Sequence, residues 1–404
     1  MREVRTYILH NWTKTFHSPS EMKGDFTVPK PYVSPSIDGR YTDLYYWDVY
    51  FTNLGLLADG FLEQVENNLE NMAWFIDTLG YVPNANTLID HSQPPLFCSA
   101  VYDYYTRTSN PAVIHKFLPY ILKEYEFWQT QRQAPFKLTR FFTQANEQTK
   151  MLYYENVHER VFETRESKSE QLCLAEDIIS IAESGADFHP RFATKRSGID
   201  AGSFLHLDAN CFLYEMESKI AKMLSVIHDN PRPFLRRAKA RKQRIRRYLY
   251  DRKQKLYLDY NFVDKRFSNV ISAVSLYPYA LGISKDKKGL RKVLQTLEYE
   301  HGIAFAPYRN ASVYYQWDYP CMWPPVVYFT FSALVNLGLF SDAKRIAKKY
   351  VRTVDENFAT TGRLWEKYDA VSGGIGQSAE YETPAMLGWT AGVYAYLDEQ
   401  LQRL

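Results

Sequence analysis

Apolar residues recur along most of this chain at the spacing of amphipathic helices. In 62–79 they repeat at i, i+3, i+4 and i+7, and Gly80 follows where a helix commonly ends. Asn110-Pro111 supplies a cap and a first-turn proline for a second helix, and Ser341-Asp342 begins a third. The same pattern predicts further helices near 47–59, 92–107, 168–183, 207–227, 232–250, 270–281, 286–298, 325–338 and 383–401.

These segments amount to about twelve helices, and strand signals are few, with 255–260 as one short example. Helices in that number without sequence repeats suggest pairs that close into a ring, but the pattern alone also fits an α-solenoid or a large bundle. Residues 1–35 are polar and contain Pro29, Pro31 and Pro35 among their prolines, and no interdomain linker is evident. We therefore expect one all-α domain over 36–404, with residues 1–35 as an N-terminal arm packed on it.

The charge of the chain is nearly balanced, with 49 Lys and Arg against 46 Asp and Glu and a net charge of +3. Such a balance does not indicate a polyanionic partner. The exception is 232–255, where basic and apolar residues follow the pattern of an amphipathic helix. We interpret its basic side as a solvated face, with contact to nucleic acid or a membrane surface as the alternative. We expect no nucleic-acid partner and no membrane partner.

The cysteines and histidines show none of the spacings of a metal site. Cys98, Cys173, Cys211 and Cys321 lie far apart, which argues against a zinc ribbon or a disulfide scaffold and fits a reducing compartment. No apolar segment follows the N-terminal charges, so no signal peptide is expected, and no run of about 18 apolar residues predicts a membrane span. We expect a cytoplasmic protein with no cofactor and no catalytic metal.

The segment 316–325 concentrates aromatic and polar side chains in a loop. Its three prolines exclude a helix or a central strand, and it contains Gln316, Trp317 and Asp318. The segment 39–50 repeats this chemistry, with an arginine followed by Trp-Asp among tyrosines. Indole faces match the apolar faces of a sugar ring, and amides and carboxylates match its hydroxyls, so both segments are typical of a small-ligand pocket. The alternative is that 316–325 only packs on the core.

Seven segments of the chain together resemble the trehalases, the glycoside hydrolases that split the α,α-1,1 linkage between two glucoses. They follow the order found in that family, from about residue 36 to the C-terminus: 39–50, 80–95, 165–167, 183–188, 316–325, 366–369 and 373–392. The resemblance implies an (α/α)6 barrel of six inner and six outer helices, and this decides between the helical architectures. It also implies an active site built by loops at one end of the barrel.

The resemblance further implies roles for individual residues. Asp187, before Phe188, stands at the position of the general acid, and Glu366, before Lys367, at that of the general base of an inverting enzyme. Inversion requires the two carboxyl groups to lie roughly 6.5–9.5 Å apart, with the attacking water between them. The implied substrate-binding residues are Arg40, Tyr41, Tyr45, Trp47, Asp48, Asn84, His91, Gln93, Arg165, Glu166, Gln316, Trp317, Asp318 and Glu380.

The chain departs from the usual trehalase pattern at several places. His91 replaces an arginine, Ala186 replaces a tryptophan, and 382–387 differs from the usual residues before Gly388. The positions of the acid and the base are kept. We therefore predict hydrolysis of a small α-linked glucoside, with trehalose as the leading substrate. The alternatives are another small α-glycoside, such as glucosylglycerate, mannosylglycerate or another disaccharide, and a non-catalytic sugar-binding or regulatory protein.

Overall fold

The computed structural model of this protein describes residues 3–24, 26–194, 198–312 and 314–404. Its helices are α1 (Glu3–Asn11), α2 (Tyr46–Asp59), α3 (Leu62–Leu79), α4 (Phe97–Thr108), α5 (Ala112–Thr130), α6 (Glu147–Val157), α7 (Lys168–Ala182), α8 (Leu207–Val226), α9 (Arg232–Tyr248), α10 (Tyr277–Ala280), α11 (Lys287–Leu297), α12 (Pro324–Asn336), α13 (Phe340–Thr361) and α14 (Gly388–Arg403).

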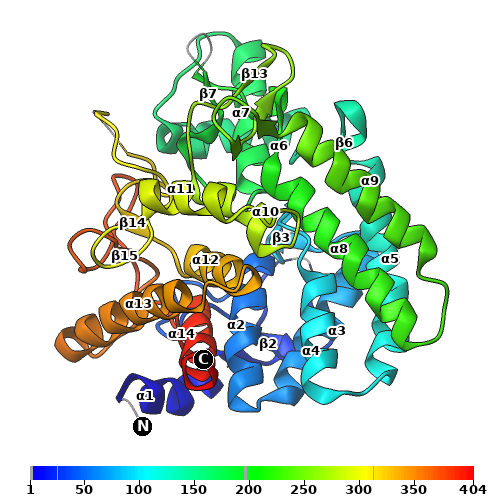
Figure 1. Cartoon of the computed structure of the whole chain (residues 1–404), viewed down its shortest axis with the longest axis vertical. Helices are drawn as coiled ribbons and strands as arrows, with labels where there is room; N and C mark the ends of the chain where they lie inside the picture. The colour runs from blue at the N-terminus through cyan, green and yellow to red at the C-terminus, as the bar shows by residue number, and fades with distance from the viewer. Residues whose placement is uncertain (1–2, 25, 195–197, 313) are drawn as a thin grey trace.

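Six helices form a closed inner ring. The contacts run from α2 to α4, α8, α10, α12 and α14, and α14 closes the ring by packing against α2. The helices α1, α3, α5, α9, α11 and α13 alternate with them along the chain and lie outside. The predicted all-α (α/α)6 barrel is therefore confirmed. The pair α6 and α7 is inserted between α5 and α8 and lies with β7 and β13 at the top of Figure 1.

The apolar pattern explains which helices lie inside. The inner helices α2 and α12 are apolar on nearly all sides and are buried over most of their length, whereas only Ala238, Arg241 and Ile245 are buried in the outer helix α9. Two glycines allow the closest approach in the ring. A Cβ atom at Gly55 of α2 would lie 2.7 Å from the Cα of Gly392 in α14, so a larger residue would force these helices apart.

Short antiparallel strands shape the connecting loops: β1 (Phe16–His17), β2 (Tyr32–Val33), β3 (Pro83–Ala85), β4 (Leu88–Ser92), β5 (Gln133–Ala134), β6 (Leu138–Thr139), β7 (Ala193–Thr194), β8 (Gly198–Ile199), β9 (Phe204–Leu205), β10 (Tyr250–Asp251), β11 (Leu256–Tyr257), β12 (Tyr260–Asn261), β13 (Arg266–Phe267), β14 (Cys321–Met322) and β15 (Tyr368–Asp369). The pairing of β14 with β15 is the most informative, because it joins the segment 316–325 to the segment 366–369.

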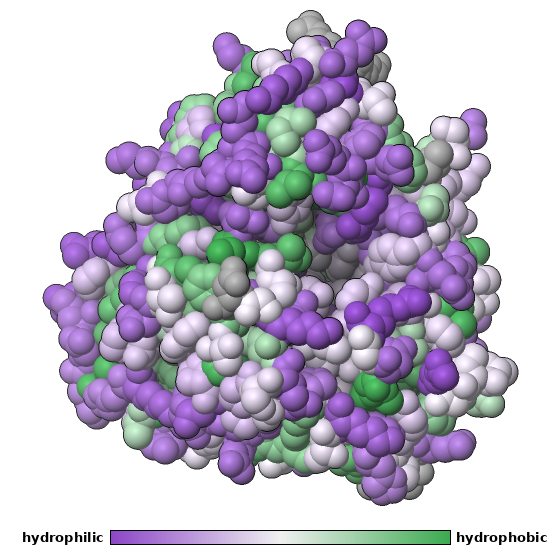
Figure 2. Space-filling view, turned by 180° about the vertical axis from the view of Figure 1, so that it is seen from behind, coloured by the Kyte–Doolittle hydropathy of each residue, from purple (hydrophilic) through white to green (hydrophobic). Residues whose placement is uncertain are grey.

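The apolar core has two parts. The larger cluster fills the barrel, and a smaller one, which includes Tyr154, Leu174, Ile178 and Phe188, lies around α6 and α7. Seen from the side opposite to Figure 1, the surface has a hollow near its centre, bordered by hydrophilic residues and by one group of hydrophobic ones (Figure 2). No described helix has the length and apolar content that crossing a membrane would require.

The N-terminal region contains more regular structure than its composition suggested. Its first helix, α1, contacts α13, and Arg5 lies 3.6 Å from Asp398 of α14, so the two ends of the chain are close together. β1 pairs with β2 within the same region. The division into an arm over 1–35 and a barrel over 36–404 stays a prediction.

Candidate active site

A cavity of about 470 Å³ lies where the inner helices α2, α12 and α14 begin, and its size is in the range of small-ligand sites. Loops and helix starts from distant parts of the chain line it, as expected for a site at one end of a barrel. It brings together these predicted residues: Tyr41, Tyr45, Trp47, Asp48, Asn84, His91, Gln93, Asp187, Gln316, Trp317, Glu366 and Glu380.

Asp187 enters the cavity from the loop that follows α7. This loop passes so close to Trp47 that a Cβ atom at Gly185 would lie 3.0 Å from the indole, and Gly185 has a φ of +73°, so a glycine is required there. The Asp187 carboxylate accepts a hydrogen bond of 3.2 Å from Nη2 of Arg160 through Oδ2. Its side chain is 33% exposed, so it reaches the solvent-accessible part of the cavity.

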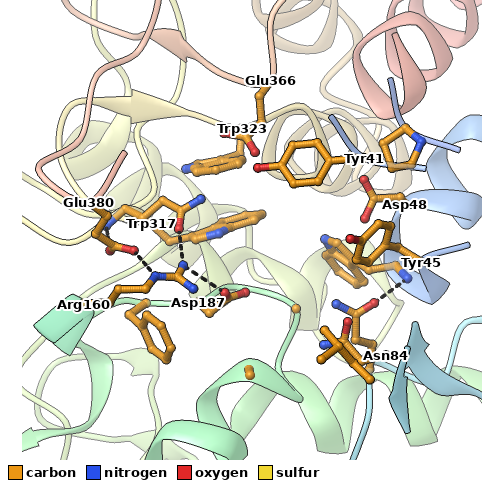
Figure 3. Close-up of a pocket in the computed structure, with 18 of the residues that line it drawn as sticks. Tyr41, Tyr45, Asp48, Asn84, Arg160, Asp187, Trp317, Trp323, Glu366 and Glu380 are labelled. Atoms are coloured by element: carbon orange, nitrogen blue, oxygen red, sulfur yellow. Dashed lines mark hydrogen bonds and ion pairs between the residues drawn. The ribbon is translucent and has the colours of Figure 1, made fainter. Parts of the chain in front are cut away.

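Arg160 joins three residues of the cavity wall. It lies in the 3₁₀ turn His158–Val161, and its guanidinium contacts Asp187, Glu380 at 2.9 Å and the Gln316 side-chain oxygen at 2.9 Å. Burial alone would lower the pKa of Arg160, but the charges of Asp187 and Glu380 outweigh it and raise the pKa, so the guanidinium stays charged. Figure 3 shows it pointing toward both carboxylates.

Glu366 faces the cavity from the opposite side to Asp187, on the loop that follows α13 (Figure 3). The Tyr381 hydroxyl lies 3.0 Å from both carboxylate oxygens, and the Lys367 ammonium donates to Oε2 at 2.7 Å. Burial raises the pKa of Tyr381 well above its usual value, so its phenol remains a donor. The Trp389 indole also donates to the backbone oxygen of Glu366 at 2.9 Å. These contacts fix the orientation of the carboxylate.

Two further carboxyl groups of the cavity have perturbed acidities. Burial, and then the negative charges of Glu366 and Asp187, raises the pKa of Asp48 well above its usual value. Burial also raises the pKa of Glu380 to about 7, although Arg160 and the Gln316 backbone N–H act in the opposite direction. Both groups therefore take up a proton more readily than an exposed carboxylate does.

Stacked indoles form one wall of the cavity. The rings of Trp317 and Trp323 lie 4.0 Å apart and are parallel within 4°, and Trp389 meets both of them edge-on. The Lys367 ammonium lies 4.9 Å from the centre of the Trp323 ring. The buried indole N–H groups of Trp47 and Trp323 have no hydrogen-bond partner among the described residues. Both nitrogens are themselves buried, so neither is open to a ligand in this structure.

His91 contributes an uncharged imidazole to the wall. Burial, and then the charge of Arg132, lowers the pKa of His91 to about 3, so the ring is neutral at physiological pH. Its Nε2 lies 2.9 Å from the Asn84 side-chain nitrogen, and its Nδ1 lies 3.5 Å from the Tyr153 hydroxyl. A neutral imidazole therefore occupies the position at which the usual trehalase pattern has an arginine.

Four of the predicted site residues are not among those that line the cavity. Arg40 and Glu166 are exposed, and Arg165 pairs with Glu163 at 2.5 Å, because the 163–167 loop runs over the surface. Asp318 is fully buried behind the wall, where it pairs with Arg309 and accepts from the backbone N–H of Tyr319 at 2.9 Å. The structure does not place these four residues on the cavity wall, and Asp318 holds the loop that carries Trp317. Their contacts with a substrate stay a prediction.

Five lining residues whose side chains carry a hydrogen-bond donor were missed by the sequence reasoning. Trp323, Tyr381 and Trp389 lie inside segments that had been singled out, so their aromatic character was an available signal. Tyr153 and Arg160 lie in α6 and the turn after it, a region without a strong apolar pattern, and only their position in space identifies them. Among the described residues, no three His, Cys, Asp or Glu side chains are arranged to hold a metal ion.

The arrangement supplies what acid–base cleavage of a glycosidic bond requires. Two carboxyl groups face each other across a cavity with aromatic walls, and each is oriented by a cationic partner. One can donate a proton to a leaving oxygen while the other removes a proton from water.

Comparison with known proteins agrees with this chemistry. A model of the trehalase family matches residues 5–401. A periplasmic trehalase from Pseudomonas aeruginosa is 30% identical over 393 residues, which cover 91% of this chain and 70% of that protein. A periplasmic trehalase from Citrobacter koseri is 28% identical over 420 residues, covering 97% of this chain and 72% of that protein.

Solved structures show the same fold. Neutral trehalase from Saccharomyces cerevisiae matches with a TM-score of 0.72 and 21% identity over 98% of this chain and 79% of that one. A mannosylglycerate hydrolase from Thermus thermophilus matches with a TM-score of 0.65 and 14% identity over 98% of this chain and 100% of that one.

The relatives correct the expected location. The prediction of a cytoplasmic protein is wrong, because curated relatives from Pseudomonas aeruginosa, Citrobacter koseri, Escherichia coli and Xanthomonas axonopodis are periplasmic trehalases. The prediction rested on the widely spaced cysteines and on the expected lack of a signal peptide and of a membrane span. The spacing of the cysteines shows only that the fold does not need disulfides, and a barrel with a core of this size is stable without them in either compartment.

Proposed function

This chain belongs to the trehalase family, and we propose that it hydrolyses α,α-trehalose to two glucose molecules. It is a glycoside hydrolase, and the question for this chain is which of its residues perform each step. The observation that carries the proposal is the placement of Asp187 and Glu366 on opposite sides of one aromatic-walled cavity.

Asp187 acts as the general acid in this proposal. Its Oδ2 is held by Arg160, and its Oδ1 makes no hydrogen bond to a described residue, which leaves that oxygen for the glycosidic oxygen of the substrate. The proton moves from Asp187 to the leaving oxygen as the bond between that oxygen and the attacked anomeric carbon breaks. Arg160 positions the carboxyl and balances the charge left on it after the transfer.

Glu366 acts as the general base. Its ionised form is balanced by Lys367 and oriented by Tyr381, so the carboxylate can take a proton from a water molecule on the other face of the sugar ring. The oxygen of that water bonds to the anomeric carbon while the leaving glucose departs with the proton from Asp187. Attack from the face opposite to the leaving group inverts the configuration.

The aromatic wall binds the sugar rings in this proposal. Trp317, which is stacked on Trp323, offers apolar ring surface for C–H groups of the sugar. Asp48, Asn84, Gln93 and Gln316 line the same cavity and supply side-chain donors and acceptors for the remaining hydroxyls. An uncharged His91 suits a neutral sugar, because no fixed charge there requires an anionic substrate.

The alternatives receive no comparable support. The likeness to mannosylglycerate hydrolase is a likeness of fold at 14% identity. A non-catalytic sugar-binding protein would have no need for two carboxyl groups that are each held by a cation across the cavity. By analogy with the relatives, we also propose a periplasmic location, which cell fractionation by osmotic shock would test.

The experiment that tests the substrate is a comparison of small α-glycosides. We expect purified protein to release glucose from trehalose with a higher kcat/KM than from glucosylglycerate, mannosylglycerate or kojibiose. The Glu366→Gln variant, with its melting temperature measured in parallel, controls for contaminating glycosidases. A protein that leaves trehalose intact while it cleaves another glycoside would disprove the proposed substrate.

A further inference from the structure

The near-neutral net charge conceals a strong separation of charge. The segments 232–255 and 285–292 contain 17 of the 49 Lys and Arg but only two of the 46 Asp and Glu. The rest of the chain has 32 basic and 44 acidic residues, so the two segments carry +15 and the remainder carries −12. We call the Lys and Arg side chains of these segments, apart from the buried Arg241, the basic face. None of them lines the cavity described above.

The two segments lie side by side. The Lys242 ammonium in α9 donates to the backbone oxygen of Gly282 at 3.0 Å, and that of Lys292 in α11 donates to the backbone oxygen of Gln254 at 2.8 Å. The second half of α9, the β10–β11 turn and the start of α11 therefore form one surface. Burial, and then the nearby charges of Arg246 and Lys285, lowers the pKa of Lys242, which agrees with this crowding of cations.

The charges of the basic face are not neutralised within the described part of the protein. Arg241 pairs with Glu217 at 2.9 Å beneath α9, whereas the other 16 cations lie within 4.0 Å of no described carboxylate. The two aspartates of these segments cap backbone groups instead, since Asp251 accepts from the Lys253 N–H at 2.8 Å and Asp286 from the Lys288 N–H at 3.0 Å. Cations elsewhere are commonly paired, and Lys116 contacts two glutamates.

We propose that the basic face binds the anionic headgroups of a phospholipid bilayer. Its shape favours a flat partner, because α9 is a straight outer helix of 17 residues, about 25 Å long, that packs its apolar side on α8 (Figure 1). Two apolar side chains of this region are exposed as well. Leu235 is 54% exposed, and Phe136, which stacks on Tyr248, is 46% exposed, so both are available to enter the interfacial zone of a bilayer.

The charge of the remaining surface gives the interaction a direction. The acidic remainder would be repelled by an anionic bilayer, so the protein would approach with the basic face first. Each Lys or Arg near an anionic membrane surface raises the partition coefficient by about fivefold, and salt screens the attraction. The sequence-based expectation of a solvated face considered 232–255 alone; the structure adds 285–292 and shows that described carboxylates do not pair with these cations.

The test is co-sedimentation of the full chain with vesicles. We expect binding to vesicles of phosphatidylglycerol and phosphatidylcholine at about 50 mM salt, release at about 500 mM salt, and no binding to pure phosphatidylcholine. The triple variant Arg236→Glu, Arg247→Glu, Lys288→Glu should lose at least tenfold in bound fraction. The triple variant Lys14→Glu, Lys123→Glu, Lys348→Glu changes the net charge equally outside the basic face and should bind like the original protein.

Several results would overturn the proposal. They are failure of the original protein to bind the anionic vesicles, equal loss in both triple variants, and retention of a duplex DNA probe without vesicle binding. Trehalose hydrolysis in solution should be the same in both triple variants as in the original protein. A failed membrane test is thereby distinguished from failure of the proposed enzymatic function, which is measured without vesicles.

Discussion

The two proposed catalytic carboxyl groups are held by different parts of the molecule. Glu366 is fixed by Lys367 and Tyr381, and the fully buried Lys367 packs on Trp323 in the main core of the barrel. Asp187 is fixed by Arg160, whose side chain is 33% exposed and which comes from the inserted α6–α7 region with its own small core. The orientation of the base is therefore linked to the stability of the barrel, whereas that of the acid depends on an insertion at its rim.

The largest effect is expected from removal of either carboxyl group. Asp187→Asn and Glu366→Gln should each lower kcat for trehalose by about 10²–10⁴-fold, because each removes one proton-transfer group and almost no volume. Steady-state kinetics measure the loss, and circular dichroism controls for folding. Near-normal activity of either variant on trehalose would show that its carboxyl group has been assigned wrongly.

The difference between the Lys367–Glu366 pair of the barrel and the Arg160–Asp187 pair at its rim should appear most clearly in the thermal stability of variants. Lys367→Met leaves Glu366 buried without its cation, and breaking a buried pair in this way typically costs about 3–5 kcal/mol. Thermal unfolding should therefore occur at a clearly lower temperature. Arg160→Met is the comparison variant and should cost less stability, because its pair with Asp187 is partly exposed and the buried Glu380, with a pKa of about 7, can take up a proton when its cation is lost. Equal losses of stability in the two variants would contradict the comparison.

A substitution of Arg160 should lower the catalytic rate even where it changes thermal stability little. Arg160→Lys keeps a positive charge but loses the planar fork that contacts Asp187, Glu380 and Gln316 together. A charge-assisted hydrogen bond contributes about 1.5–3 kcal/mol, so we expect kcat to fall by roughly 10–100-fold. The pH profile of kcat/KM should also move, because Arg160 acts through Asp187. An unchanged profile with a loss confined to KM would indicate a substrate-binding role instead.

The smallest effect concerns the pH dependence of stability through Glu380. Its folded-state pKa of about 7 lies above the usual 4.5, so the folded protein binds this proton more tightly than the unfolded chain. This stabilisation is complete below pH 4.5 and is lost as the pH rises to about 7, roughly 3 kcal/mol in all. The difference in melting temperature between the original protein and Glu380→Gln should narrow over that range. A difference in melting temperature that stays constant with pH would show that Glu380 is not the group that takes up this proton.

The helical pattern predicted most of the barrel from the sequence. The predicted helices 62–79 and 47–59 correspond closely to α3 and α2, because a continuous apolar stripe and a following glycine mark both ends. The helix predicted over 383–401 begins later, at Gly388, because the backbone N–H groups of Met386 and Leu387 donate to Leu364 and Pro35 instead of continuing a helix. The first turn of the predicted helix 92–107 is replaced by a loop that contains Pro94 and Pro95.

The site was predictable where it lies in continuous segments and unpredictable where it depends on packing. Trp47, Asp187, Gln316 and Glu366 were named because each stands in a recognisable run of residues. Arg160 was not, and Arg165 five residues later was named instead, because both lie in one irregular segment and only the fold shows which guanidinium enters the cavity. Asp318 lies behind the wall while its neighbour Trp317 lines the cavity, and the sequence alone does not show which side chain of this loop faces the cavity.

The stereochemistry of the products tests the proposed inverting mechanism, with a water molecule activated by one carboxyl group, most directly. Proton NMR can follow the first glucose anomers released from trehalose before they interconvert. If Glu366 activates water while Asp187 protonates the leaving group, the attacked ring becomes β-glucose and the leaving ring stays α-glucose, so the two anomers should appear in equal amounts. Release of α-glucose alone would indicate retention through a covalent intermediate, and it would contradict the roles assigned to Asp187 and Glu366.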